Sequence, residues 1–251
     1  MTFDDLPALR DVPSVTAAQM AEVDRMTIEE LHIPVDLLME NASHQIAATA
    51  RAFLGGSVAG KRVIGLVGSG NNGGDVAGAL RHLLNWGARI SAEFTGPHDR
   101  VRETTRHQLT RILVATTAEI AIVHDASQKG FRDLEADLLL DGFLGYSARG
   151  APRETLAELI DAANVSRVPI LAVDLPSGVD PDTGAAPGVA IRAAPTVTLA
   201  LPKPGLLEPR AHEYVGQLLL ADIGVPHAAF AKLGIDTWRL FEQGDLVRVM
   251  T

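Results

Sequence analysis

From residue 62 onward, short apolar runs alternate with longer amphipathic segments. The runs VIGLV, DLLLD and PILAVD are almost continuously apolar, which is typical of strands covered by helices on both faces. This alternation predicts an α/β fold with a mostly parallel central sheet. The strands that we expect are 62–67, 88–95, 119–123, 137–141, 168–173, 195–201 and 216–221, and the helices between them are 74–86, 99–114 and 153–164.

Two further helices are expected before the first of these strands. Thr16 and Gln19 have the spacing of a capping box, and the apolar residues behind them predict a helix from about 16 to 31. The second helix should run from about Asp36 to the pair Gly55–Gly56, because glycine readily adopts the left-handed conformation of a helix end. The residues expected on its buried side are Leu37, Leu38, Ala42, Ile46, Ala50 and Phe53 or Leu54.

The chain contains no internal repeat, no low-complexity tract and no polar linker long enough to divide it. The segment 181–193, which contains two prolines and two glycines, is expected to be a loop after a strand. We therefore expect a single domain over residues 1–251, in which the N-terminal helices pack on the sheet.

Composition excludes several classes of protein. With 22 Lys and Arg against 31 Asp and Glu, the net charge of −9 is opposite to that of a general nucleic-acid binder. The absence of cysteine excludes disulfides, thiolate zinc sites, iron–sulfur clusters and cysteine nucleophiles, and it fits a cytoplasmic protein. The acidic N-terminus does not resemble a signal peptide, and the apolar runs are far shorter than the roughly 18 residues of a membrane span. We expect a soluble protein.

The stretch 68–75, GSGNNGGD, follows the first expected strand. Its glycines allow the close approach of a ligand, and a helix N-terminus behind them favours negative charge, which suits a phosphate or diphosphate. The adjacent asparagines and the closing aspartate add side-chain oxygens that a simple phosphate loop does not need. The alternative is a tight turn capped by these polar side chains.

Two more polar loops follow expected strands. Asp141 ends the strand 137–141, where a buried carboxylate would need a cation or several donors, although a role as helix cap or loop hydrogen-bonder is the alternative. Asp174 directly follows the strand 168–173, and Ser177 comes three residues later. Together, such carboxylate, hydroxyl, amide and carbonyl oxygens are hard ligands that prefer alkali or alkaline-earth cations. Asp174 is also a candidate for proton transfer, whereas for Asp174 and Asp180 an Asx turn is the alternative.

Other candidate residues carry less weight. Lys203 follows the strand 195–201 and either faces the same pocket or is solvated. The eight histidines are scattered without the spacing of a zinc site. Neither Ser147 nor Ser177 lies in the Gly-x-Ser-x-Gly turn of serine hydrolases, which argues against a serine nucleophile.

From about Val15 to Val225, the chain resembles the NAD(P)H-hydrate epimerase family, also called the YjeF N-terminal domain. The segments that carry the resemblance are Leu38-Met39-Glu40-Asn41-Ala42, Asn71-Asn72-Gly73-Gly74-Asp75, Arg81-His82-Leu83, the Asp141 loop, Asp174-Leu175-Pro176-Ser177-Gly178 and Pro202-Lys203-Pro204-Gly205. The order and spacing of the asparagine block and the Asp-x-Pro-Ser-Gly motif make this resemblance specific.

The resemblance implies a Rossmann-like three-layer α/β/α sandwich that forms a homodimer and interconverts the R and S forms of hydrated NADH and NADPH. It implies one K⁺ per subunit, held by Asn72, Asp141 and Ser177. The residues implied to contact the substrate are Asn71, Asn72, Gly73, Gly74, Asp75, Gly145, Tyr146, Ser147, Ala148, Arg149, Gly150, Ala151 and Asp174. A dehydratase domain, to which such domains are often fused, is not expected within this chain.

Two positions depart from the family pattern. Val76 follows the asparagine block where a Gly or Ala is usual, and Gly145-Tyr146-Ser147 replaces a Gly-Thr-Gly sequence. Neither change removes an implied ligand side chain, but the second places an aromatic ring in the implied substrate loop.

Epimerisation requires that the hydroxyl of the hydrated ring leaves and returns on the other face, or that the ring opens and recloses. Either route needs a group that gives and takes a proton, and Asp174 is our candidate catalytic residue. A scaffold or binding module with a decayed site is one alternative, against which the retained polar residues argue. An NAD(P)-dependent dehydrogenase is another, with Glu93 near the position of a ribose-binding acid.

Overall fold

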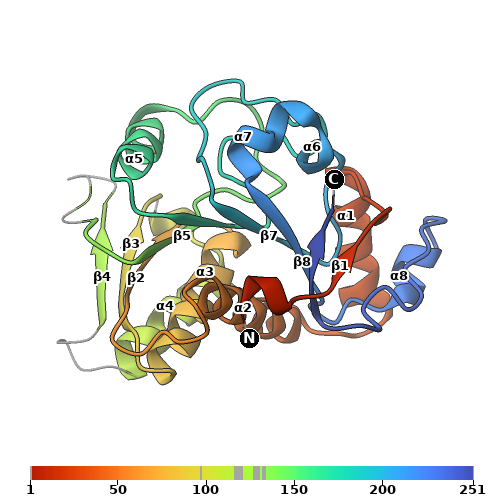
Figure 1. The fold of residues 1–251 in the computed structure, drawn as a ribbon, viewed down its shortest axis with the longest axis horizontal. Helices are drawn as coiled ribbons and strands as arrows, with labels where there is room; N and C mark the ends of the chain where they lie inside the picture. Colours follow the sequence, from red (N-terminus) through yellow and green to blue (C-terminus); the bar gives the residue numbers. More distant parts are fainter. Residues whose placement is uncertain (1, 97, 116–120, 127–130, 132–133, 251) are drawn as a thin grey trace.

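One sheet crosses the molecule and carries the strands in the order β1-β9-β8-β7-β6-β5-β2-β3-β4 (Figure 1). This computed structural model describes residues 2–96, 98–115, 121–126, 131 and 134–250. Within them, neighbouring strands pair in parallel except β8 and β9. The strands are β1 (Ala8–Leu9), β2 (Arg62–Val67), β3 (Arg89–Phe94), β4 (Ala121–Asp125), β5 (Leu138–Gly142), β6 (Ile170–Val173), β7 (Pro195–Leu199), β8 (Gln217–Ala221) and β9 (Leu246–Val249).

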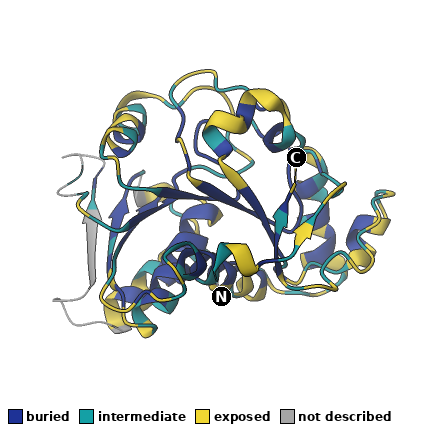
Figure 2. Cartoon of the chain, viewed as in Figure 1, coloured by how far each residue is buried: buried dark blue, intermediate teal, exposed yellow. Residues whose placement is uncertain are grey.

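Helices cover both faces of this sheet and make the expected three layers. The helices are α1 (Ala17–Arg25), α2 (Val35–Phe53), α3 (Asn71–Asn85), α4 (Glu103–Ala115), α5 (Glu154–Val165), α6 (Pro204–Leu207), α7 (His212–Val215) and α8 (His227–Ala231). Helices α1 to α4 lie on one face, with α8 beside them, and α5 to α7 on the other. The strands are buried between the two layers, and the exposed positions gather on the outer sides of the helices (Figure 2). The predicted α/β/α sandwich is confirmed.

The strand order reverses beside β2. From β2 the chain proceeds through α3 to β3, whereas from β5, the other neighbour of β2, it proceeds through α5 to β6 on the opposite side. The two crossovers therefore leave a crevice at the carboxyl ends of β2 and β5, which is where open α/β sheets bind ligands.

Several element boundaries differ from the sequence prediction. Helix α3 begins at Asn71 rather than at 74, because Gly70 is extended and ends the loop, so the asparagine block forms the first helical turn. The expected helix 16–31 is α1 followed by a π-helical turn, Met26–Glu30. Part of the expected strand 119–123 lies outside the described residues.

Some elements were not expected at all. These are β1, β9, α6, α7, α8 and the 3₁₀ turns Phe3–Asp5 and Pro209–Ala211, all of which are five residues or shorter. The expected helix 99–114 is the 3₁₀ turn His98–Arg100 followed by α4. The expectation that Leu37 is buried was wrong: its exposure is 57%, because it lies on the outer side of α2, opposite Ile46 and Ala50. In the described part of the chain, no helix combines the length and apolar character needed to cross a membrane.

Candidate active site

A cleft of about 350 Å³ opens at the crevice beside β2 and β5. Its walls come from α1, α2, the N-terminal turn of α3 and the loops that follow β3, β5, β6 and β7. The polar residues that line it are Asp24, Asn71, Asn72, Asp75, Arg102, Tyr146, Ser147, Asp174 and Lys203, and the apolar wall includes Met20, Leu38, Met39, Phe143 and Ile223.

Asn72, Asp141 and Ser177 lie together although they come from three separate segments. The Ser177 hydroxyl and amide donate to the Asp141 carboxylate at 2.7 and 2.8 Å, and the Leu144 amide donates to the Ser177 hydroxyl at 2.9 Å. The Asn72 side chain donates to the carbonyls of Leu144 and Val173 at 2.7 and 3.0 Å. Asp141 therefore joins β5 to the loop after β6 rather than capping a helix.

One oxygen atom of this cluster has no hydrogen-bond partner in the described part of the chain, and a second group is a buried carboxyl. Oδ1 of Asn72 is buried and has no hydrogen-bond partner within the described residues. Asp141 is fully buried, and burial raises its pKa to about 6, against the opposing effect of the hydrogen bonds from Ser177 and Phe143. An unpartnered buried oxygen beside a buried carboxylate fits a bound cation.

The composition of the cluster indicates the type of cation. It contains one carboxylate, one amide, one hydroxyl and backbone carbonyls, which are hard oxygen donors with a single formal negative charge. Among the described residues, no group of three or more His, Cys, Asp or Glu side chains is arranged to hold a metal ion. The donor set therefore suits a monovalent ion better than a divalent one.

Asp174 forms a buried ion pair with Lys203. The Lys203 side chain is only 1% exposed, and its ammonium donates to Oδ1 of Asp174, which also accepts from the Leu199 amide at 3.3 Å. The pair is brought together by sharp bends at two adjacent strand ends, where Asp174 and Ala200 both have positive φ angles, 65° and 63°. Asp174 is thus strained rather than placed in an Asx turn, and Lys203 is not solvated.

Asp180, for which an Asx turn was the alternative, does form such a turn. Its carboxylate accepts from the amides of Asp182 and Thr183 at 3.1 and 2.9 Å.

Two more carboxyl groups face the cleft. Burial, together with the charges of Asp174 and Asp24, raises the pKa of Asp75 well above its usual range, and no described residue forms a hydrogen bond with its carboxyl group. Asp24, on α1, accepts a hydrogen bond from the Tyr146 hydroxyl at 2.6 Å. Burial raises the pKa of Asp24, and burial and the nearby Asp24 raise that of Tyr146.

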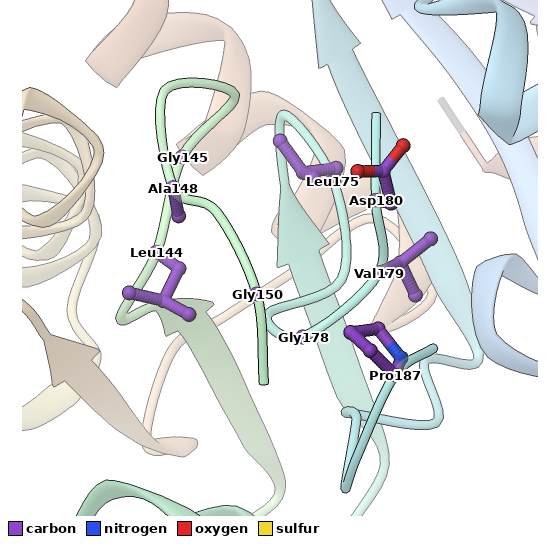
Figure 3. Close-up of a pocket in the computed structure, with 9 residues that line it drawn as sticks. All are labelled: Leu144, Gly145, Ala148, Gly150, Leu175, Gly178, Val179, Asp180 and Pro187. Carbon is purple, nitrogen blue, oxygen red and sulfur yellow. The ribbon is translucent and has the colours of Figure 1, made fainter. Parts of the chain in front are cut away.

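The loop after β5 borders two cavities. Gly145, Tyr146 and Ser147 line the main cleft, and Gly145 also lines a smaller cavity of about 20 Å³ together with Ala148 and Gly150. Figure 3 shows this smaller cavity, closed opposite the loop by Leu175, Gly178, Val179, Asp180 and Pro187. The Arg149 guanidinium donates to two carbonyls of its own loop, and Ala151 lines neither cavity.

The glycines of the asparagine block have structural reasons of their own. A Cβ at Gly73 would lie 2.1 Å from the Gly68 carbonyl oxygen, and one at Gly74 would lie 2.8 Å from Met39. Gly70, by contrast, has open space around it and lines the cleft. Gly73 and Gly74 therefore let α3 pack closely, and Gly70 leaves room in the cleft.

Sequence reasoning missed Asp24 and Arg102 of the cleft, and it left Lys203 open between the pocket and solvent. Asp24 lies in a helix of mixed polarity with no motif, and Arg102 lies in a polar segment before α4. Lys203 was noted without a partner, although its position after a strand and beside two prolines was the available signal. Glu93, considered as a ribose-binding acid, is buried in β3 and does not line the cleft.

Comparisons with known proteins agree with this architecture. Residues 35–205 match the family described as YjeF-related protein N-terminus. An NAD(P)H-hydrate epimerase of Dehalogenimonas lykanthroporepellens is 39% identical over 240 residues, which cover 95% of this chain and 93% of that protein. An NAD(P)H-hydrate epimerase of Leuconostoc mesenteroides is 32% identical over 84% of this chain and 90% of its own length.

Two further likenesses extend the comparison. A bifunctional NAD(P)H-hydrate repair enzyme Nnr of Moorella thermoacetica is 36% identical over 86% of this chain, which spans 41% of that protein. The crystal structure of the yeast protein ynu0 has the same fold, with a TM-score of 0.79, 23% identity and coverage of 94% of this chain and 100% of that one. The family model matches well over half of the chain, and it agrees with the relatives of nearly equal length. The chain therefore belongs to the family of YjeF-related protein N-terminal domains.

Proposed function

We propose that this protein is an NAD(P)H-hydrate epimerase, an isomerase that interconverts the R and S hydrates of NADH and NADPH in cofactor repair. Relatives of nearly the same length carry this name. The observation that carries the proposal is that the buried Asp174–Lys203 pair lines the same cleft as Asn72. Asn72 is in turn connected, through the backbone of Leu144, to the buried pair of Ser177 and Asp141. A fold alone would not assign this activity, because the same fold supports many reactions.

The reaction requires a balanced exchange of one proton and one water molecule. The hydrated carbon of the ring carries a hydroxyl and is bonded to the ring nitrogen. When the hydroxyl takes up a proton, the C–O bond breaks, water leaves, and the nitrogen lone pair forms a cationic C=N bond. Water then adds to the other face of the carbon and gives up a proton, so the isomers exchange without net consumption of any reactant.

Asp174 and Lys203 are the groups that we assign to this proton. They lie in the cleft, share a hydrogen bond and are shielded from solvent, with exposed side-chain fractions of 7% and 1%. A hydrogen-bonded carboxylate and ammonium can deliver a proton to the departing hydroxyl and accept one from the incoming water. The neighbouring carboxyl group of Asp24 lines the same cleft and, when ionised, would stabilise the positive charge that develops on the ring.

We further propose that Asn72, Asp141 and Ser177 hold one K⁺, together with nearby carbonyl oxygens. The unpartnered Oδ1 of Asn72 and the buried charge of Asp141 support this assignment. Bound K⁺ would supply a positive charge that neutralises Asp141. The Asn72 and Ser177 side chains would then keep the loops after β5 and β6 in the arrangement that lines the cleft.

The substrate-binding residues remain those expected from the sequence. Five of them lie in the first turns of α3 (Asn71, Asn72, Gly73, Gly74 and Asp75), and seven lie in the loop after β5 (Gly145, Tyr146, Ser147, Ala148, Arg149, Gly150 and Ala151). The last, Asp174, directly follows β6. A homodimer and a cytoplasmic location also remain predictions. Light scattering of the purified protein measures the first.

The proposal is tested with purified protein and a hydrate preparation enriched in one isomer. Chromatography follows the approach to the R/S equilibrium and compares it with the slow spontaneous rate. Asp174→Asn should abolish the enzymatic rate and leave the circular dichroism spectrum unchanged. Asp161→Asn, at an exposed position on α5 outside the cleft, is the matched control and should retain full activity.

One result would contradict the epimerase proposal, and another would contradict only the role of Asp174. Equilibration by the unmodified protein at no more than the spontaneous rate would favour a binding or scaffold module. Near-normal turnover by Asp174→Asn would leave the epimerase assignment intact but remove Asp174 from the mechanism.

A further inference from the structure

The charges in the cleft are unevenly distributed. Lys203 and Asp174 lie at the ends of β7 and β6, where the lysine is already engaged by the aspartate. The remaining cleft cation, Arg102, is tied to the other side of the crevice, since its amide donates to the carbonyl of Ser69, two residues past β2, at 2.9 Å. Strands β2 and β6 are two positions apart in the sheet, which corresponds to a separation of about 10 Å.

Arg102 has a firmly held backbone. Its carbonyl accepts a hydrogen bond from the Arg106 amide at 3.0 Å, and this bond closes the first turn of α4. Next to it, the Thr105 hydroxyl donates to the Gly70 carbonyl at 2.8 Å, and the Thr104 hydroxyl donates to Asn71 at 3.1 Å. These contacts fix the start of α4 against the start of α3, so the position from which the arginine side chain extends is well defined.

The guanidinium group itself is available. Arg102 lines the cleft, the residue is exposed, and its guanidinium forms no ion pair with any residue that the structure describes. It is near enough to Tyr146 for its positive charge to oppose the rise in the pKa of that phenol. The cleft contains three aspartates, and yet this arginine has no carboxylate partner among the described residues, so it can bind an anionic group of a ligand.

We propose that Arg102 binds the diphosphate of the dinucleotide substrate, and that the hydrated ring consequently lies at the Asp174–Lys203 end of the cleft. This assignment rests on the proposed epimerase function. It gives each end of the substrate a site of opposite charge: the anionic diphosphate meets Arg102, and the ring, which becomes cationic during the reaction, meets the aspartates. The ribose between ring and diphosphate spans the distance between the two sites.

Other positions in the cleft fit the diphosphate poorly. Lys203 is buried and its ammonium is committed to Asp174, and an anion beside Asp24 or Asp75 would face another carboxyl group. Arg102 also lies beside Gly70, which has no side chain to block the approach of a bulky anion. A guanidinium can form two parallel hydrogen bonds with phosphate oxygens, which a lysine cannot do.

The test compares Arg102→Ala with Arg106→Ala, which removes the same charge one turn further along α4 at a position that does not line the cleft. For Arg102→Ala we expect KM for the hydrate of NADH to rise about tenfold while kcat stays within about twofold. The reason is that this substitution removes one charge-assisted contact to a part of the substrate that lies far from the reacting carbon. Arg106→Ala should leave both constants unchanged. Arg102→Lys should recover only part of the loss.

A second measurement does not depend on turnover. ADP-ribose carries the diphosphate and lacks the nicotinamide ring, so its Kd, measured by calorimetry, should increase about tenfold in Arg102→Ala and remain unchanged in Arg106→Ala. If the unmodified protein shows no epimerase activity, the proposed function fails, and this binding comparison still tests Arg102.

Two results would overturn the assignment. One is an unchanged KM and an unchanged ADP-ribose Kd in Arg102→Ala. The other is a loss several-fold larger for the hydrate of NADPH than for that of NADH, because this would assign Arg102 to the 2′-phosphate instead. Equal losses for the two hydrates support the diphosphate.

Discussion

At the scale of single residues, the buried pair of Asp174 and Lys203 has both a structural and a chemical consequence. Removing one partner leaves the other charge buried without compensation, which typically destabilises a protein by about 3–5 kcal/mol. Replacing both partners by neutral groups avoids this penalty. Stability and activity should therefore respond differently to single and double substitutions.

We expect Lys203→Met to lower the free energy of unfolding by about 3 kcal/mol and to abolish epimerisation. Asp174→Asn combined with Lys203→Met should regain most of the lost stability, because no unpaired charge remains, and should stay inactive. Urea unfolding and the isomer assay measure the two effects. A double variant as unstable as Lys203→Met would mean that packing rather than charge causes the loss.

Asp141 leads to a prediction about pH. Its pKa of about 6 in the folded protein exceeds the ordinary value of 3.8, so the folded state holds this proton more tightly than the unfolded chain. The protonated carboxyl of Asp141 therefore makes its full contribution to the free energy of unfolding below about pH 4. This contribution, about 3 kcal/mol, is lost as the pH rises through about 6. A bound cation would offset that loss, because it favours the ionised carboxylate.

We therefore expect KCl to raise the melting temperature more at about pH 8 than at about pH 5, relative to choline chloride at equal ionic strength. Asp141→Asn should remove this K⁺ effect at both pH values. In the absence of K⁺ at the higher pH, the variant should be at least as stable as the unmodified protein, since it no longer buries a charge. Stabilisation by KCl that is independent of pH and survives in Asp141→Asn would argue against a K⁺ site there.

At the scale of elements, the start of α3 depends on close backbone packing. Gly73→Ala would place a Cβ 2.1 Å from the Gly68 carbonyl oxygen, whereas at Gly70 a Cβ meets nothing within 4 Å. We expect Gly73→Ala to destabilise the protein by about 2–3 kcal/mol, as overpacking of a tight contact does. Gly70→Ala should fold normally, and it should weaken substrate binding because its methyl group enters the cleft. Equal melting temperatures for the two variants would contradict this distinction.

Tyr146 connects the loop after β5 to α1 through its hydrogen bond to Asp24. Tyr146→Phe removes the hydroxyl but keeps the ring, so we expect a loss of about 0.5–1.5 kcal/mol in stability. If the bond also holds the loop against the cleft, KM should rise with little change in kcat. Tyr214→Phe, on α7 away from the cleft, is the control. An unchanged KM in Tyr146→Phe would limit the hydrogen bond to a structural role.

The elements of this fold differed in how far the sequence predicted them. Long apolar runs such as that of β5 predicted the parallel sheet and its layers, because a strand that is buried on both faces is almost continuously apolar in the sequence. The start of α3 was misplaced because glycine is a poor helix former, and only the close approach to Gly68 explains why glycines are used there. The short strands β1 and β9 depend on pairing with strands far away in the sequence, β1 with β9 and β9 also with β8, which no local pattern records.

The candidate site was predictable in the same uneven way. Its motif residues, such as Asn72, Asp141 and Ser177, were found because each lies near the end of a strand, and parallel strands end at one edge. The sequence did not indicate the roles of Asp24 and Arg102 or the partner of Lys203, because these depend on contacts between segments far apart in the sequence. Ion pairing across about 30 residues leaves no spacing rule to detect.

At the scale of the whole molecule, the two ends of the chain close one edge of the sheet. Strand β1 pairs in parallel with β9, and the amides of Arg248 and Met250 donate to the carbonyls of Pro7 and Leu9 at 2.7 and 2.9 Å. Near these contacts, Leu6 is buried and the ring of Phe3 packs on that of Phe53. The N-terminal segment thus covers a strand edge that is otherwise free to pair with another chain.

Removing residues 2–10 should therefore destabilise the protein without altering its chemistry. Loss of the buried Leu6 side chain, the Phe3 contact and the strand pairing should lower the free energy of unfolding by about 3 kcal/mol, and the exposed edge of β9 should promote association. Because none of these residues lines the cleft, kcat measured below the melting temperature should not change. Asp4→Asn, an exposed change in the same segment, should alter neither quantity. A truncated protein with unchanged stability but reduced kcat would instead place the N-terminal segment in the function of the cleft.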